Sequence, residues 1–123
     1  MSAVIHEPFA ERFRDPDSPY LSPVKVSEAF GLRVQDLAEG AHVHRNTPTA
    51  RPHAAQLQGY LQDMVRVLAV ASDMSGDVDR AVFLLRNEPL RAFDYKTAEK
   101  LVQEGRADDV VAYLRSLAGG AAG

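Results

Sequence analysis

The apolar and polar positions of this chain recur with the spacing of helices rather than strands. The longest run lies between Leu57 and Ala71, where apolar residues return every three or four positions. This spacing places them on one face of a helix, against a core. The stripe consists of Leu57, Tyr60, Leu61, Met64, Val65, Leu68 and Ala71, and Val67 and Val70 widen it. The pattern predicts a central core helix.

Two shorter helices are predicted before it. Val26, Ala29 and Phe30 share one face of a segment that begins at Val24 and that Gly31 ends. The same spacing then returns in residues 34–43, although a glycine inside a helix costs about 1 kcal/mol relative to alanine. Its apolar positions are Val34, Leu37, Ala38 and Ala41, with Gly40 among them and a turn expected near His42 and Val43.

Prolines limit the segments on either side. Pro48 lacks an amide donor and restricts Thr47 before it, so the helix predicted within residues 44–52 should be short or bent. Residues 1–23 contain four prolines and are interpreted as an arm without long elements. A single turn from Pro8 to Phe13 is compatible with this composition and would let Phe9 and Phe13 dock the arm.

Three helices are predicted after the central one. Asp77 stands near the start of the first, which Pro89 ends. Thr97 caps the second, which has Glu99 in its first turn and stops before Gly105. Asp108 is expected to cap the last, with Gly119 and Gly120 closing it. The apolar positions of the first are Val78, Ala81, Val82, Leu84 and Leu85, and those of the last are Val110, Val111, Leu114 and Leu117.

The predicted fold class is therefore all-α, because no β-hairpin signal and no internal repeat occur. We expect an N-terminal arm over residues 1–23, a helix-turn-helix-like helical bundle over residues 24–75, and a small three-helix module over residues 76–123.

The amino-acid composition excludes several classes of protein. The chain has 123 residues, of which 46% are hydrophobic and 25% charged, as in ordinary globular proteins. Its net charge of -3 argues against a protein that coats nucleic acid non-specifically. No cysteine is present, which excludes disulfides and thiolate chemistry. We expect neither a signal peptide nor a membrane span, and hence a cytoplasmic protein.

The sequence contains no complete catalytic or metal-binding motif. His42 and His44 point to different sides of a helix, with no cysteine and no carboxylate motif nearby to complete a zinc site. The segment DMSGDVD has its glycine too early for a calcium loop, and Leu84 stands where a glutamate ligand belongs. No catalytic triad, phosphate loop or HExxH motif occurs. We expect no metal, no cofactor and no enzymatic activity.

The segment DLAEGAHVHRNTP resembles the middle of a helix-turn-helix, with the small Ala38 in the first helix and Val43 tucked into the turn. Side chains leading its second helix suit phosphates and base edges. They are Arg45, Asn46, Thr47 and Arg51. A bundle whose helices merely build a core is the alternative interpretation of this segment.

Residues 76–117 carry a second resemblance. An apolar helix, an N-E-P-L loop, the run KTAEKLVQEG and the run DDVVAYLRSL follow one another, and this order resembles the C-terminal toxin-binding domain of Xre/MbcA/ParS antitoxins. The matching positions are Arg86, Asn87, Glu88, Pro89, Lys96, Thr97, Leu101, Val102, Gly105, Val110 and Leu114. The chain departs from the family at Leu84 and Leu85, where a tryptophan is common, and at Tyr95, where a glycine is common.

The resemblance implies an antitoxin that forms a hetero-oligomer with a RES-domain toxin, a protein that degrades NAD. We expect the toxin to contact Lys96, Arg106, Tyr113 and Arg115, because tyrosine and arginine contribute much of the binding energy at interfaces. The resemblance further implies that the tail reaches the toxin's NAD pocket. That tail includes Gly119, Gly120 and Gly123.

Two other hypotheses stay open. In the first, the chain is a stand-alone helix-turn-helix regulator that binds operator DNA through Arg45 and Arg51. In the second, it is a helical subunit of an unrelated assembly. An antitoxin of this kind would combine toxin binding with operator binding.

Overall fold

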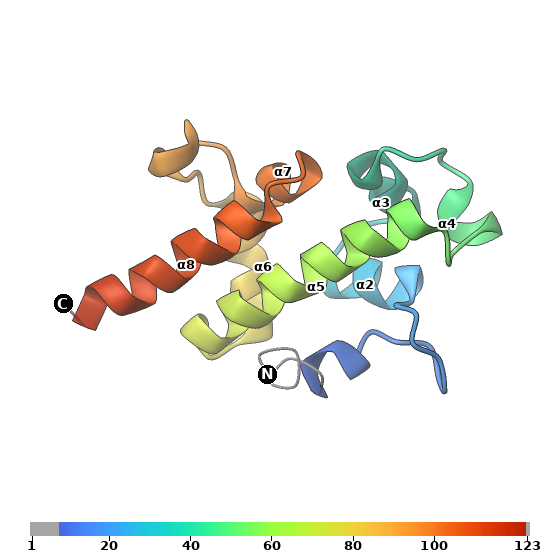
Figure 1. The fold of residues 1–123 in the computed structure, drawn as a ribbon, viewed down its shortest axis with the longest axis horizontal. Helices are drawn as coiled ribbons and strands as arrows, with labels where there is room; N and C mark the ends of the chain where they lie inside the picture. Colours follow the sequence, from blue (N-terminus) through green and yellow to red (C-terminus); the bar gives the residue numbers. More distant parts are fainter. Residues whose placement is uncertain (1–7, 123) are drawn as a thin grey trace. The chain divides into compact units, whose positions relative to one another are not determined.

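The computed structural model describes residues 8–122, and their side chains as far as Gly119. It confirms the all-α class, because this part of the chain contains helices and only isolated β-bridges. The chain forms two compact units, unit 1 (Met1–Arg66) and unit 2 (Val67–Gly123). Their boundary falls inside the longest helix, α5 (Ala55–Ser75), which is the predicted central core helix (Figure 1).

Unit 1 gathers three short helices and the first half of α5. The short helices pack in chain order, α2 against α3 and α3 against α4 (Figure 1). Their interior is formed by fully buried aliphatic side chains, which include Val26, Leu37, Leu57 and Leu61. The bounds are α2 (Pro23–Phe30), α3 (Val34–Ala41) and α4 (Thr47–Ala50).

The ends of α2 follow from its sequence. The hydroxyl of Ser22 accepts a hydrogen bond from the Lys25 amide, and Pro23 occupies the first turn, where a missing amide costs nothing. Gly31 ends the helix with a φ of 66°, in the left-handed region that glycine adopts easily. This confirms the predicted helix and its stop, with the start one residue inside the predicted arm.

The described part of the arm docks as predicted. Residues 8–11 form one helical turn, and the Phe9 and Phe13 rings lie 5.4 Å apart. Phe13 is buried, and its carbonyl accepts a hydrogen bond of 2.7 Å from the Ser22 amide. The phenylalanine pair therefore anchors a segment that has almost no regular structure.

Gln58 of α5 ties the arm to the rest of unit 1. Its side chain is buried and pairs with both backbone groups of Leu21, accepting from the amide at 3.0 Å and donating to the carbonyl at 2.8 Å. It also donates to the Pro52 carbonyl at 2.9 Å. A buried backbone group without a partner is costly, and here one side chain satisfies three of them.

The helix α4 is short, as predicted, but Pro48 is not what ends it. Pro48 lies in the first turn of α4, where its missing amide would have had no partner. The helix ends at Arg51 instead, since Pro52 disfavours helical angles for the residue before it and Arg51 has φ -139° and ψ 63°.

Gly40 inside α3 has a packing reason. A Cβ atom at this position would lie 2.6 Å from Cζ of Tyr60, a buried side chain on α5. The cost of a glycine within a helix is therefore accepted so that α3 approaches the tyrosine ring closely.

Unit 2 follows the predicted order of helices. The helices α6 and α7, and then α7 and α8, pack against each other (Figure 1). Asp77 caps α6, Thr97 caps α7 through the Lys100 amide, and Gly105 has the expected left-handed φ of 80°. The elements are α6 (Val78–Asn87), the 3-10 turn η1 (Arg91–Phe93), α7 (Ala98–Gln103) and α8 (Ala107–Ala122).

The last helix corrects three expectations. The helix begins at Ala107, whose side chain is buried in the core. Asp108 therefore lies in the first turn of the helix rather than at its cap. Gly119 and Gly120 do not close it, since the helix continues to Ala122. Leu117 is 46% exposed, because it lies beyond the turns whose Val110 and Val111 reach the core.

Within residues 8–122 no helix is long and apolar enough to cross a membrane.

We predict that Gln58→Met destabilises the protein by about 2 kcal/mol, because it keeps the side-chain volume and strands three backbone groups. Urea unfolding at pH 7 measures the change. Gln62→Met, on the exposed face of the same helix, should change stability by less than about 0.5 kcal/mol. Equal stabilities for the two variants would contradict this role of Gln58.

Candidate functional site

A closed loop between α6 and α7 organises the exposed surface of unit 2. The backbone of the buried Leu90 holds both ends of this loop, donating to the Lys96 carbonyl and accepting from the amides of Phe93 and Tyr95, each at 2.9 Å. The turn η1 lies between them. Residues 90–96 are thus a hydrogen-bonded loop, and the Tyr95 side chain at its end is 63% exposed.

Two residues predicted for toxin binding meet at this loop through a third that the sequence did not reveal. The Phe93 ring meets the Tyr113 ring edge-on with centroids 5.5 Å apart, and Cζ of Arg106 lies 5.1 Å from the Phe93 centroid. We call Phe93, Arg106 and Tyr113 the aromatic–arginine cluster. These are residue types that contribute strongly to protein interfaces.

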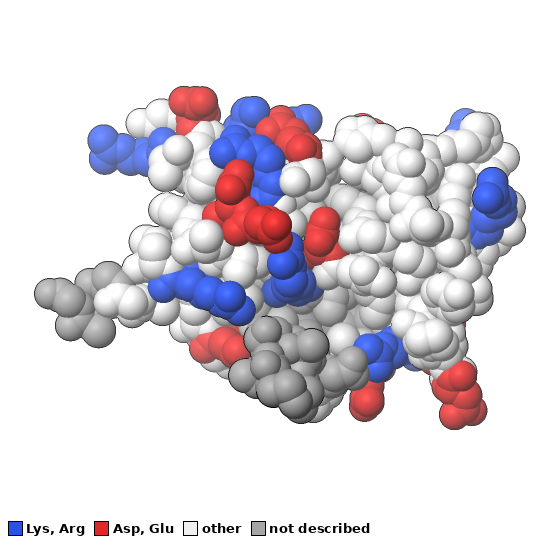
Figure 2. All heavy atoms as spheres, viewed as in Figure 1, with Lys and Arg blue, Asp and Glu red and all other residues white. Residues whose placement is uncertain are grey.

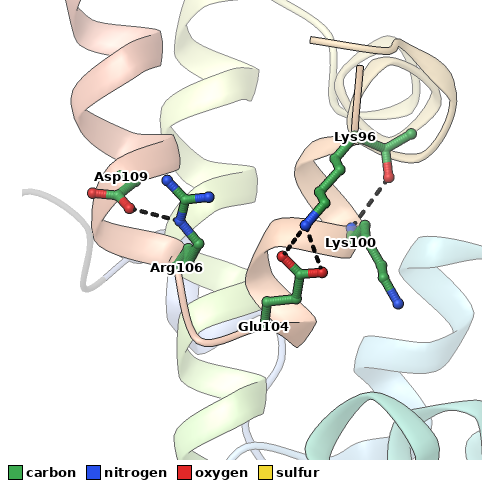
Figure 3. Close-up of polar contacts among 6 residues, drawn as sticks. Lys96, Lys100, Glu104, Arg106 and Asp109 are labelled. Carbon is green, nitrogen blue, oxygen red and sulfur yellow. Dashed lines mark hydrogen bonds and ion pairs between the residues drawn. The ribbon is translucent and has the colours of Figure 1, made fainter. Parts of the chain in front are cut away.

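Two cationic side chains of this surface, Lys96 and Arg106, are engaged in ion pairs (Figure 3). Nζ of Lys96 lies 3.0 and 3.1 Å from the two Glu104 oxygens, and Nε of Arg106 lies 2.9 Å from the Asp109 carboxylate. The hydrogen bond from Lys96 lowers the pKa of Glu104 from its ordinary value of 4.5. A partner that contacts Lys96 or Arg106 must therefore accommodate the acidic residue beside each.

The remaining predicted contacts lie on α8 and beyond it. Arg115 is exposed on α8, and Gly119 lies on the same helix with open space around its Cα. Gly120 belongs to α8 by its backbone. Gly123 lies outside the described residues.

The described part of unit 2 has two further large exposed apolar side chains that the spacing of apolar residues did not predict. Phe83 on α6 is 64% exposed and Met74 on α5 is 42% exposed. Phe83 falls off the apolar stripe of α6, of which Ala81 and Leu85 are buried. That offset was the available signal, because a large apolar residue away from the stripe must face outward.

The four residues predicted for DNA contact surround α4 rather than lead a long helix. Arg45 and Asn46 precede α4, Thr47 is its first residue, and Arg51 follows it. Arg45, Asn46 and Arg51 are exposed. A helix of four residues is about 6 Å long, about half the width of a major groove. The helix-turn-helix arrangement therefore stays a prediction.

The surroundings of α4 are nonetheless positive. Residues 40–62 contain Arg45 and Arg51 but no aspartate or glutamate. Basic side chains are visible at the end of unit 1 that carries α4, whereas both signs mix over α7 (Figure 2). Exposed aromatic rings lie in the same unit, where Tyr20 stacks on His53 with centroids 4.0 Å apart.

The comparisons place the chain in no family. No family model matches it, and neither does any curated protein or solved structure. Among residues 8–122 no group of three or more histidine, aspartate or glutamate side chains is arranged to hold a metal ion. The candidate sites are therefore described by their own geometry, as two surfaces without a metal cluster in the described residues.

We predict that Glu104→Gln lowers stability at pH 7 and that the difference from the wild type shrinks as pH falls below 4.5. A lowered pKa in the folded state contributes stability above the unfolded value, and this contribution is lost as the carboxylate becomes protonated. Urea unfolding between pH 7 and pH 3 measures it. Lys96→Met in the Glu104→Gln background should add no further pH dependence. A difference that is constant across this range would contradict the prediction.

Proposed function

We propose that this chain is the antitoxin of a type II toxin–antitoxin pair, and that unit 2 binds and blocks a RES-domain toxin that degrades NAD. Its activity would be inhibition rather than catalysis. Since the toxin's substrate is a cytoplasmic cofactor, we propose the cytoplasm as the compartment. The resemblance of residues 76–117 to Xre/MbcA/ParS antitoxins motivates the proposal.

The observation that carries the proposal is the exposed surface of unit 2. Tyr95 and Arg115 are exposed, and the aromatic–arginine cluster combines the exposed Arg106 with the half-buried rings of Phe93 and Tyr113. Aromatic and arginine side chains are enriched where proteins bind each other, and they are enriched further among the residues that dominate affinity. This composition favours a protein partner over a small substrate.

The form of α8 suggests how inhibition would work. Its residues 115–119 are all exposed, so the helix extends past the turns that bury Val110 and Val111. The sequence of this end, AGGAA, makes a narrow helix. We propose that it inserts into the toxin's pocket as a helix, whereas an extended tail would have been expected from its glycines.

A second function, operator binding by unit 1, is favoured by the absence of carboxylates from residues 40–62. Arg45 and Arg51 flank α4 on this surface, and arginine contacts with phosphates are strengthened where no carboxylate competes. This function would serve autoregulation in an antitoxin or stand alone in a transcriptional regulator.

For the antitoxin function, we predict that the full chain co-purifies with a co-expressed RES-domain protein encoded beside it and preserves cellular NAD. Arg115→Glu should raise the dissociation constant about tenfold, as expected for loss of a contributing interface arginine. Arg80→Glu on α6, where Arg80 is also exposed, should leave the dissociation constant unchanged. Removal of residues 119–123 should leave binding intact and weaken inhibition, which NAD measurements on the same samples report. Absence of a complex with the full chain would refute the function.

For the DNA function, we predict that Arg45→Ala with Arg51→Ala weakens binding to the promoter fragment of its own gene. The slope of log affinity against log salt should decrease by about 2, since each phosphate contact contributes about 0.9. Gel shifts at several salt concentrations measure it, with Arg33→Ala as the control because Arg33 already pairs with Asp36. An unchanged slope would exclude this surface.

A further inference from the structure

Tyr95 has a backbone conformation that its side chain disfavours. Asp94 and Tyr95 have φ values of 56° and 65°. Of the non-glycine residues with positive φ in the described chain, these two are adjacent in the sequence. Left-handed angles suit glycine and are tolerated by aspartate, but they are an outlier for a bulky residue. A tyrosine here is less favourable for folding than a glycine would be.

The fold offers no compensation through burial of this side chain. Tyr95 is 63% exposed, so its ring contributes little to the core that α6, α7 and α8 share. Strained residues with large exposed side chains are characteristic of functional sites, where the strain is retained because the side chain acts on something else. The Tyr95 side chain is therefore expected to have a role other than stabilising the fold of unit 2.

The loop keeps Tyr95 in this conformation. Its amide donates to the carbonyl of the buried Leu90 at 2.9 Å, and the neighbouring Lys96 closes the loop by accepting from the Leu90 amide. The Lys96 side chain is in turn fixed to Glu104. The backbone at Tyr95 is thus already ordered, so a partner that binds this side chain does not have to order the loop.

We infer that Tyr95 is the anchor of the partner interface, and that its ring enters an apolar pocket of the partner protein that offers a hydrogen-bond acceptor to the phenol. Its neighbours support a protein partner. Phe93, two residues away on the same loop, joins Arg106 and Tyr113 in the aromatic–arginine cluster. Tyrosine and arginine together are the common composition of residues that dominate interface affinity. The inference rests on the proposed function, because it takes the RES-domain toxin as that partner.

The test separates folding from binding with Tyr95→Gly. Glycine relieves the backbone strain and removes the anchor, so the urea midpoint should stay the same or rise while affinity for the RES-domain protein falls at least tenfold. Asp94→Gly is the matched control, because it relieves the neighbouring left-handed residue and should leave affinity within twofold. Tyr95→Phe should lose several-fold in affinity if the phenol finds an acceptor.

Each outcome has a separate meaning. Wild-type chain that does not bind the RES-domain protein would refute the proposed function and this inference with it. Wild-type binding that Tyr95→Gly leaves unchanged would overturn the inference alone. A lower urea midpoint for Tyr95→Gly would also overturn it, since the side chain would then be structural. Sedimentation of the full chain as a dimer that Tyr95→Gly dissociates would assign the ring to a second copy of this chain and overturn the inference as well.

Discussion

One buried amide organises unit 1. The segment before α2 is rich in proline and pairs with itself in an isolated bridge at Arg14 and Leu21. The hydrogen bonds of this bridge use the neighbouring residues, so the buried Leu21 still needs partners for its own amide and carbonyl. Gln58 provides them with the donor and acceptor of a single side chain, as a neighbouring strand would. The same amide holds Pro52, which sets the end of α4. The positions of Arg51 and of the Tyr20–His53 stack therefore depend on an interaction in the interior.

In unit 2, the backbone hydrogen bonds of an irregular segment are made within the segment itself. Here the backbone of Leu90 serves as the fixed point, with its side chain in the core and its amide and carbonyl closing the loop of residues 90–96. Because the contacts are local, this loop does not require a long-range side-chain clamp of the kind that Gln58 provides. The consequence is an exposed Tyr95 whose backbone is held by a hydrogen bond to Leu90.

The two surfaces differ in the chemistry they offer. Residues 40–62, which include α4, contain arginines and no carboxylates, a composition that suits a phosphate backbone. On unit 2, Lys96 and Arg106 have acidic partners, so their net charge is small and aromatic groups dominate. Since paired exposed ions add little affinity, Lys96 and Arg106 would contribute to recognition by unit 2 less through charge than through shape and apolar contact. One small chain thus separates an electrostatic surface from an aromatic one.

The sequence by itself determined the helices and most of their ends. Periodic apolar positions defined α5, and Asp77, Thr97, Gly31 and Gly105 marked boundaries because capping and left-handed angles are local properties of these residues. It misjudged α8, which begins before Asp108 with the buried Ala107 and continues through Gly119 and Gly120 to Ala122.

Tertiary structure alone decided which side chains meet. Nothing in the spacing of Gln58 and Leu21, 37 positions apart, reveals that their polar groups pair, and nothing marks Phe93 as the residue that joins Arg106 to Tyr113. Tyr95 is the clearest case. Its left-handed angle arises from hydrogen bonds to Leu90 across a closed loop, so its strain and exposure exist only once the loop has formed. The local conformational preferences of residues follow from the sequence alone, whereas contacts between distant residues depend on how the chain packs.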